Sequence, residues 1–192
     1  DFTQLFNYKF IALKDSLKLV GDVKFIITKA GNYGPYRRDT PVLWDWGSHD
    51  LSTLISLIGS NPQQISSQKI KEKENKVGEE SLWNISCTFA NGINSSSLIG
   101  NMLPKCRKIG VLGTKGMLVF DDVGTNPLMF YNEWKDKYFP RKEGLLLEIN
   151  RNTNPLHVVI DTFSDLIRKD IKKHWTLEMG VEISKLLSKC EY

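Results

Sequence analysis

The sequence predicts an α+β fold in which an open, mostly antiparallel sheet carries its helices on one face. Three observations lead to this expectation. Apolar side chains have helical spacing near both ends of the chain, they alternate with period two in between, and turn residues separate the short alternating runs. The 192 residues, 41% hydrophobic and 25% charged, fit a single globular domain over residues 1–192 with a substantial core.

The first part of the chain predicts two helices around one strand. Apolar residues at positions 6, 10, 13, 17 and 20 indicate an amphipathic helix over residues 5–20, ended by Gly21. Residues 22–30 alternate as a half-buried strand does, and two glycines and two prolines make residues 31–41 a loop. A second helical stripe then consists of Leu51, Leu54, Ile55 and Ile58.

The middle of the chain predicts short strands separated by turns. We expect them at residues 83–89, 95–100, 108–112, 117–120, 128–131 and 145–149. The glycine-rich segment Gly110–Gly116 resembles a phosphate-binding loop, but such a loop must open a helix. An apolar, strand-like run follows instead, so the segment is expected to form a tight hairpin.

Two helices are predicted at the C-terminal end. The first begins with Asn154 as its cap and Pro155 at its first position. Its expected buried stripe consists of Leu156, Val159, Ile160, Phe163 and Ile167. Thr176 is expected to cap the second helix, with Glu178 near its positive end. The residues expected to face inward are Ile183, Leu186 and Leu187.

The charges, the cysteines and the hydropathy restrict the classes of partner. The net charge of +4 comes from lysines mixed with acids over residues 69–76 and 168–173, which indicates solvated surface rather than a nucleic-acid interface. No run of 18 apolar residues and no hydrophobic leader occur, so we expect a cytoplasmic protein without membrane contact. Three widely spaced cysteines predict reduced thiols, with neither a disulfide framework nor a metal site.

An acid and a histidine stand four residues apart in Trp44-Asp45-Trp46-Gly47-Ser48-His49. If this segment is helical, Asp45 and His49 share one face, and the carboxylate can hold the imidazole as a general base. His157 and His174 lack an acid at such a spacing and are expected at the surface. The spacing alone leaves open a structural role, in which Asp45 caps a helix and His49 packs beneath a tryptophan.

Several segments, taken in order, resemble the C-terminal domain of the glucose-fructose oxidoreductase, inositol dehydrogenase and MocA (Gfo/Idh/MocA) family. The most specific is the pair Asp45 and His49, set in a glycine-containing turn before a leucine-rich helix. Weaker similarity covers residues 5–10, 34–39, 109–122 and 176–182, so the resemblance extends over almost the whole chain. Many members carry an acid three residues after the histidine; this chain has Ser52 there, and Asp50 is a candidate substitute.

The resemblance implies the substrate-side half of an NAD- or NADP-dependent dehydrogenase that acts on a sugar, a sugar nucleotide or a polyol. In that family an N-terminal Rossmann domain binds the dinucleotide, and the lysine of a Glu-Lys-Pro motif assists catalysis. This sequence contains neither the glycine fingerprint nor that motif, so we expect no cofactor-binding residue in it and no activity from this chain alone. His49 is the expected proton acceptor, and Asp45 is the group that orients it.

Substrate-binding candidates precede this pair in the sequence. They offer hydroxyl, guanidinium, carboxylate and ammonium groups that suit sugar hydroxyls or a phosphate. These candidates are Tyr33, Arg37, Arg38 and Asp39 in the loop, and Lys9 in the first predicted helix. A local surface pair of Arg38 and Asp39 is the alternative for those two residues.

The competing hypothesis is a non-enzymatic α+β module that binds a carbohydrate or a partner protein. In either case one face of the sheet lacks helices, and we expect that face to be covered by a second copy in a homo-oligomer. The sequence leaves open the identity of the substrate, the choice of NAD or NADP, the direction of the reaction and the size of the oligomer.

Overall fold

The computed structural model describes residues 2–74, 77–132, 144–149 and 152–190. Its strands are β1 (Val23–Gly31), β2 (Gln64–Glu74), β3 (Glu79–Thr88), β4 (Asn94–Gly100), β5 (Cys106–Gly113), β6 (Gly116–Asp121), β7 (Leu128–Asn132) and β8 (Leu145–Leu146). They form one sheet in the order β2-β3-β4-β1-β5-β6-β7-β8. β1 pairs in parallel with β4, and the other neighbouring strands pair antiparallel. The predicted α+β class and mostly antiparallel sheet are confirmed.

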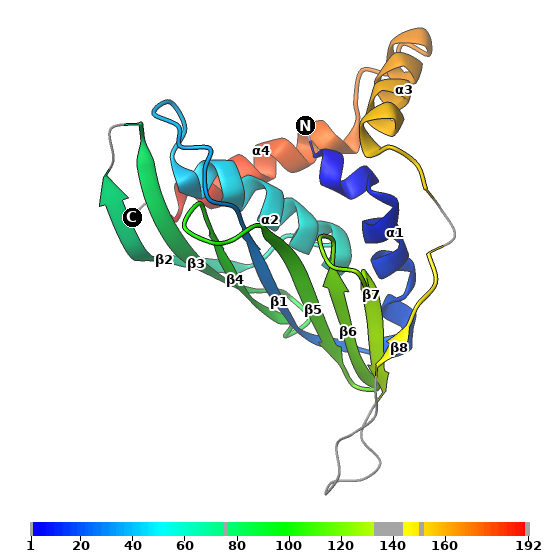
Figure 1. Ribbon diagram of the computed structural model, residues 1–192. Helices are drawn as coiled ribbons and strands as arrows, with labels where there is room; N and C mark the ends of the chain where they lie inside the picture. Colours follow the sequence, from blue (N-terminus) through cyan, green and yellow to red (C-terminus); the bar gives the residue numbers. More distant parts are fainter. Residues whose placement is uncertain (1, 75–76, 133–143, 150–151, 191–192) are drawn as a thin grey trace, which may run out of the picture.

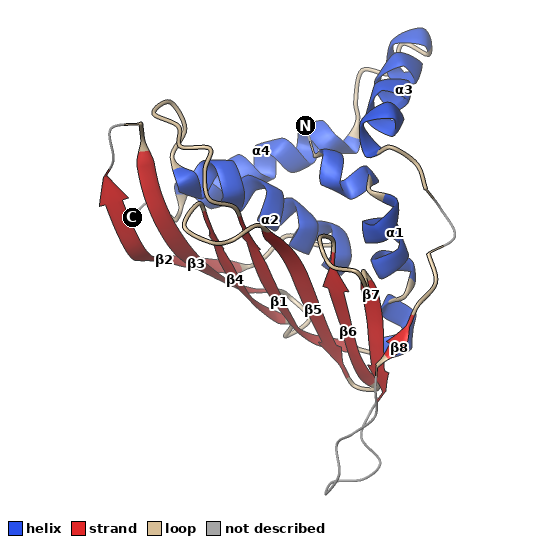
Figure 2. Cartoon of the chain, viewed as in Figure 1, coloured by secondary structure: helices blue, strands red, loops and turns tan. Residues whose placement is uncertain are grey.

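The helices are gathered on one side of this sheet, as Figures 1 and 2 show. They are α1 (Tyr8–Asp15), α2 (Val42–Ile58), α3 (Pro155–Arg168) and α4 (Trp175–Ser188), with the short 3-10 helices η1 (Thr3–Phe6) and η2 (Leu17–Val20). The core lies between α2 and the sheet, where Leu51, Leu54, Ile85 and Val111 are fully buried.

The helix predicted over residues 5–20 is divided into η1, α1 and η2. The division begins at Asn7, whose side chain accepts a hydrogen bond from the backbone N–H of Lys9 and caps α1. An Asn cap requires a non-helical backbone at that residue, so the apolar periodicity continues while the helix does not. Gly21 has a φ of 70° and leads into β1, as predicted.

Helix α2 begins at Val42, so the expected turn around Asp45 and Gly47 is wrong: both residues are helical. Gly47 is needed for packing, because a Cβ atom there would lie 2.9 Å from Cδ2 of Leu187 in α4. The absent side chain therefore allows α2 to lie close to α4. Gly59, with a φ of 79°, ends the helix at the predicted place.

The predicted strands are all present, with somewhat different bounds, and β8 is shorter than the expected 145–149. The glycine-rich segment forms the β5–β6 hairpin, with Gly113 opposite Gly116, which confirms the prediction. Strand β2 was not predicted. Its charged residues are those of an edge strand, where both faces tolerate contact with water and the apolar alternation is lost.

The two C-terminal helices differ from the prediction in one important respect. Asn154 caps α3 as predicted, but the expected burial of its apolar stripe is wrong: Leu156, Ile160, Phe163 and Ile167 are 51–65% exposed. Figure 1 shows α3 (orange) projecting away from the sheet. An amphipathic pattern defines an apolar face, but it does not say what covers that face.

Helix α4 packs against α2 through Ile183, Leu186 and Leu187, which are buried as predicted. Its N-cap is His174 rather than Thr176: the His174 side chain accepts a hydrogen bond from the backbone N–H of Thr176. Cys87, Cys106 and Cys190 are buried and none is disulfide-bonded in the described part of the chain, and burial raises the pKa of Cys87 to about 12. No described helix has the length and hydropathy that a membrane span requires.

Candidate functional site

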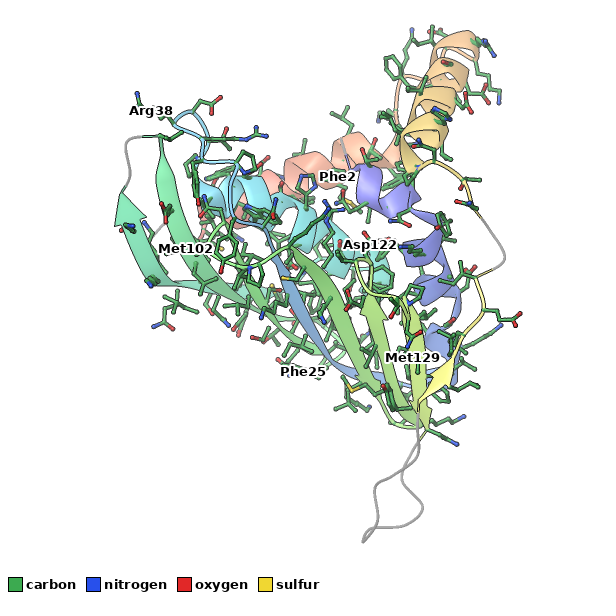
Figure 3. All side chains as sticks on the ribbon, in the orientation of Figure 1. Phe2, Phe25, Arg38, Met102, Asp122 and Met129 are labelled. Carbon is green, nitrogen blue, oxygen red and sulfur yellow. The ribbon has the colours of Figure 1, made fainter. Side chains whose placement is uncertain are left out.

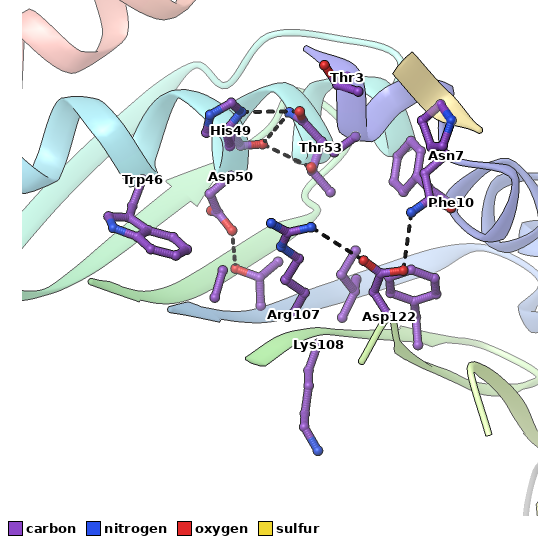
Figure 4. A pocket seen from close by; sticks show the side chains of 16 residues that line it. Thr3, Asn7, Phe10, Trp46, His49, Asp50, Thr53, Arg107, Lys108 and Asp122 are labelled. Atoms are coloured by element: carbon purple, nitrogen blue, oxygen red, sulfur yellow. Dashed lines mark hydrogen bonds and ion pairs between the residues drawn. The ribbon is translucent and has the colours of Figure 1, made fainter. Parts of the chain in front are cut away.

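A cavity of about 350 Å³ lies between the middle of α2 and the strands beneath it (Figure 4). Residues from six parts of the chain line it: η1 and the start of α1, β1, α2, β5, β6 with the turn that follows, and Pro155 at the start of α3. Those that carry polar chemistry are Gln4, Asn7, Thr28, His49, Asp50, Arg107 and Asp122. The sequence therefore brings together groups that are more than 100 residues apart.

His49 projects from α2 into this cavity, and its ring is held by Gln4 (Figure 4). Nδ1 of His49 and Oε1 of Gln4 are 3.1 Å apart. The amide nitrogen of Gln4 donates to Oγ of Ser52 at 2.7 Å and to the His49 carbonyl at 3.3 Å, which directs Oε1 of Gln4 toward the ring. With the amide oxygen as acceptor, Nδ1 of His49 carries the proton and Nε2 keeps its lone pair. In this tautomer Nε2 is the ring nitrogen that can accept a proton.

The pKa of His49 is lowered from its ordinary value of 6.5. The main cause is partial desolvation of the ring by the surrounding protein; Arg107 contributes in the same direction, and the Asp45 carboxylate opposes both. Part of the residue remains open to solvent. At neutral pH the imidazole is therefore uncharged and able to accept a proton.

Asp45 lies one turn before His49 on α2, on the predicted face. Its Oδ2 is 3.9 Å from Nε of Arg37, and among the described contacts it is Gln4, not Asp45, that hydrogen-bonds the His49 ring. Asp45 acts on His49 through its charge, which raises the pKa of the imidazole. The alternative of a helix cap does not apply, because the N-cap of α2 is Pro41.

The opposite side of the cavity is formed by Arg107 of β5 and Asp122 after β6 (Figure 4). Nη1 of Arg107 is 3.5 Å from Oδ2 of Asp122, and Oδ1 of Asp122 accepts from Nδ2 of Asn7 at 3.2 Å. Lys9 donates to the Asp122 carbonyl at 2.8 Å. Lys9, a predicted substrate ligand, therefore holds Asp122 and is not itself among the residues that line the cavity.

The four loop candidates lie outside this cavity. Tyr33 is 66% exposed, and Asp39 is exposed as well. Arg37 and Arg38 border a second cavity of about 670 Å³, together with Lys69, Glu79 and Trp83. In Figure 3, Arg38 and Asp122 are far apart. The structure thus places Tyr33, Arg37, Arg38 and Asp39 outside the cavity that His49 lines, and Arg37 reaches Asp45, one turn before His49.

Among the polar cavity residues that the sequence patterns did not predict are Gln4, Arg107 and Asp122. A signal for Arg107 was available, because it alternates in step with Ile109 and Val111, which are buried on the helix-covered face of β5. A charge on that face is unusual and indicates a site. Gln4 and Asp122 carried no such signal, since their positions depend on how the chain folds back.

Neither a dinucleotide nor a metal ion has an evident set of ligands in the described part of the chain. The glycine-rich segment is a hairpin rather than a loop that opens a helix, so it offers no cradle of helix N-terminal amides for a pyrophosphate. No group of three or more His, Cys, Asp or Glu residues within the described ranges is placed to hold a metal.

Comparison with solved structures identifies the class of protein. A proposed oxidoreductase from Magnetospirillum magnetotacticum MS-1 is 31% identical and has a TM-score of 0.84, with 99% of this chain covering 62% of that one. Biliverdin reductase from Synechocystis sp. PCC 6803, solved with biliverdin and NADP+, is 15% identical with a TM-score of 0.78 (100% and 62% covered). Aldose-aldose oxidoreductase from Caulobacter crescentus, solved with glycerol, is 15% identical with a TM-score of 0.77 (98% and 58% covered).

The sequence itself matched no family model and no curated protein. The structural relatives are oxidoreductases, and the biliverdin reductase among them was solved with NADP+. These relatives are oxidoreductases of the Gfo/Idh/MocA type, which agrees with the sequence resemblance, and the chain has the fold of the part of them that it covers, consistent with a C-terminal domain. It spans about 60% of the length of these relatives.

The charges around His49 make its titration a direct test of this geometry. Because Asp45 raises the pKa of His49 and Arg107 lowers it, Asp45→Asn should lower the midpoint further and Arg107→Gln should raise it. Both midpoints can be followed by NMR of the imidazole ring. Asp161→Asn, an exposed residue of α3 that does not line the cavity, is the matched control and should leave the midpoint unchanged. An unchanged midpoint in Asp45→Asn would show that the two groups are not coupled.

Proposed function

We propose that this chain is the substrate-side domain of an NAD(P)-dependent dehydrogenase that oxidises or reduces a sugar, a sugar nucleotide or a polyol. One observation carries the proposal: the uncharged imidazole of His49 lines a 350 Å³ cavity together with guanidinium, carboxylate and amide groups. Such a set of donors and acceptors suits a ligand with several hydroxyl groups. The aldose-aldose oxidoreductase relative, solved with glycerol, supports the same class of ligand.

In the proposed reaction His49 moves the proton; a nicotinamide, when bound, would supply the hydride chemistry. During oxidation, Nε2 of His49 takes the proton of the substrate hydroxyl as the carbinol carbon is oxidised. The Nδ1–H bond to Gln4 keeps Nε2 free, and the charge of Asp45 stabilises the imidazolium that forms. Asp45 and Gln4 are therefore positioning residues, and Arg107 is placed to bind a substrate oxygen. In reduction the same proton returns to the product.

The nicotinamide would be bound by an N-terminal Rossmann domain, and α3 is the surface we assign to contact with it. Eight large apolar side chains between residues 156 and 181 are 45–65% exposed: Leu156, Ile160, Phe163, Ile167, Ile171, Trp175, Leu177 and Val181. An exposed apolar surface of this kind is typical of a protein–protein or domain–domain contact. α3 also contacts η1, which borders the catalytic cavity, so a domain bound to α3 would lie next to His49.

The decisive experiment is to join this chain to the region encoded upstream of it and to assay the purified protein for nicotinamide reduction at 340 nm. A panel of aldoses, polyols and sugar nucleotides should contain at least one substrate, with NAD or NADP as the oxidant. The present chain alone should show no turnover. If the upstream region encodes no dinucleotide-binding domain, the non-enzymatic module becomes the better explanation, with the same cavity serving as a carbohydrate-binding site.

The uncovered face of the sheet is proposed as the surface of a homo-oligomer. Ile27 and Leu112 are about half exposed there, and Ile27 and Met117 approach each other over Gly110. Figure 3 shows Phe25 projecting from the same side of the sheet, away from the helices.

Replacing Ile27 with glutamate should convert the oligomer to a monomer in light scattering, because a charge would be buried without a partner. Val123→Glu is the matched control, since Val123 is similarly exposed but lies in the turn after β6. A wild-type protein that is monomeric at high concentration would exclude this interface.

A further inference from the structure

Asp50 is a buried carboxyl group that the proposed proton transfer does not use. It follows His49 on α2, is only 5% exposed and lines the same cavity. Figure 4 shows its side chain directed from α2 toward the strands, between Trp46 and Arg107. The Oγ1 hydroxyl of Thr28 donates to Oδ1 of Asp50 at 2.5 Å, whereas Oδ2 has no hydrogen-bond partner among the described residues.

The surroundings of Asp50 favour its neutral form. The nearby Arg107 forms its ion pair with Asp122, and no cation within the described part of the chain lies at ion-pair distance from Asp50. An unpaired carboxylate in such a place would be costly, whereas a protonated carboxyl is tolerated if its O–H finds an acceptor. Burial accordingly raises the pKa of Asp50, and interactions with Ser97 and Thr28 oppose the shift only in part.

The acceptor for that O–H is not supplied by the described protein atoms. Ser97 lies near enough to influence the Asp50 carboxyl, but neither Oγ of Ser97 nor Oδ2 of Asp50 forms a hydrogen bond of acceptable geometry among the described residues. Buried polar atoms are nearly always paired in native proteins, so a persistent exception calls for a partner. The cavity that Asp50 shares with His49 is the place from which a ligand oxygen can supply it.

We propose that Asp50 is a specificity-determining residue, which in its protonated form donates a hydrogen bond from Oδ2 to an oxygen of the cavity ligand. His49 and Asp50 then contact the same ligand from neighbouring positions on α2: His49 at the reacting hydroxyl and Asp50 at a second oxygen. A ligand without that second oxygen would leave the O–H of Asp50 unpaired and would be rejected. The inference rests on the proposed function for the class of ligand, a polyhydroxylated molecule.

The test uses this 192-residue chain with myo-inositol as the probe, observed by NMR. In the wild-type chain the carboxyl carbon of Asp50 should have the chemical shift of a protonated carboxyl group at pH 7. Addition of myo-inositol should shift this signal and the signals of His49 and Thr53. Asp50→Asn retains a donor and should keep the affinity within about threefold. Asp50→Leu removes it and should weaken binding by about fivefold or more.

Ser97→Ala separates the proposal from a purely structural role, in which Asp50 and Ser97 only satisfy each other. The proposal predicts unchanged binding in this variant. Absence of any cavity shift with myo-inositol, an ionised Asp50 at pH 7, or wild-type affinity in a folded Asp50→Leu chain would each overturn it. The carboxyl signal of Asp50 is measured in the wild-type chain, so the proposal can still be tested if the Asp50→Leu variant does not fold. Binding of myo-inositol to this chain requires no cofactor, so it can be measured even if the complete protein shows no dehydrogenase activity. Failure of the proposed role of Asp50 is therefore distinguishable from failure of the proposed function.

Discussion

Replacing His49 with alanine should lower the turnover number of the complete dehydrogenase by about 100- to 10,000-fold, the usual contribution of a general base. The structure gives the reason: His49 lines the cavity with Nδ1 bound to Gln4, which leaves Nε2 available as the proton acceptor, and no other histidine of the described residues lines that cavity. The fold should be unaffected, because the ring lies at the cavity and outside the apolar core. Thermal unfolding of the variant within a few degrees of wild type would confirm this.

The pH profile of the complete enzyme gives the mechanism a separate test. Oxidation needs the uncharged imidazole, so kcat/KM should fall as the pH drops through the pKa of His49, which lies below 6.5. This acidic limb should disappear in His49→Ala. His157→Ala, a change of an exposed histidine on α3, is the matched control and should keep both the rate and the limb. Wild-type turnover in His49→Ala would refute the assignment of the base.

The second large effect concerns stability. Leu54→Ala should lower the free energy of unfolding of this chain by about 2–5 kcal/mol, the usual range for a buried leucine that leaves a cavity. Leu54 is 0% exposed at the contact between α2 and the sheet, and α2 carries Asp45, His49 and Asp50. Urea denaturation followed by circular dichroism measures the change.

Leu156→Ala is the matched control for that measurement, since both residues belong to apolar helical stripes of the sequence. Leu156 is 51% exposed, so its removal should change the stability of this chain by no more than about 0.5 kcal/mol. A loss at Leu156 as large as that at Leu54 would mean that α3 packs against the body of this chain in solution. The proposal that another domain covers α3 would then be wrong.

Local patterns predicted the elements well and their boundaries less well. The alternation over residues 22–30, the Gly110–Gly116 hairpin and the cap at Asn154 depend on neighbouring residues alone, and all three are confirmed. The division of the first helix at Asn7 was missed, because an Asn cap interrupts the helix although the apolar periodicity continues. The early start of α2 was missed, because the helix tolerates Gly47 in its interior. The charged edge strand β2 had no apolar alternation to reveal it.

The candidate site was predictable only in part, for the same reason. Asp45 and His49 are four residues apart, so helix geometry places them on one face whatever surrounds the helix. Gln4, Arg107 and Asp122 reach His49 only because η1, β5 and the turn after β6 converge on α2. The loop residues Arg37 and Arg38 precede the pair closely in sequence, yet they border a different cavity.

The sequence by itself determined the α+β class, the resemblance to the Gfo/Idh/MocA family and the pair of acid and histidine on one helix face, since each depends on the order and spacing of residues along the chain. Only the tertiary structure decided which groups surround that pair: an amide rather than a carboxylate holds the imidazole, and Asp50 is buried with one oxygen unpaired. It also decided that the apolar face of α3 is open. The physical reason is that burial and long-range contact depend on how distant segments pack, which periodicity cannot encode.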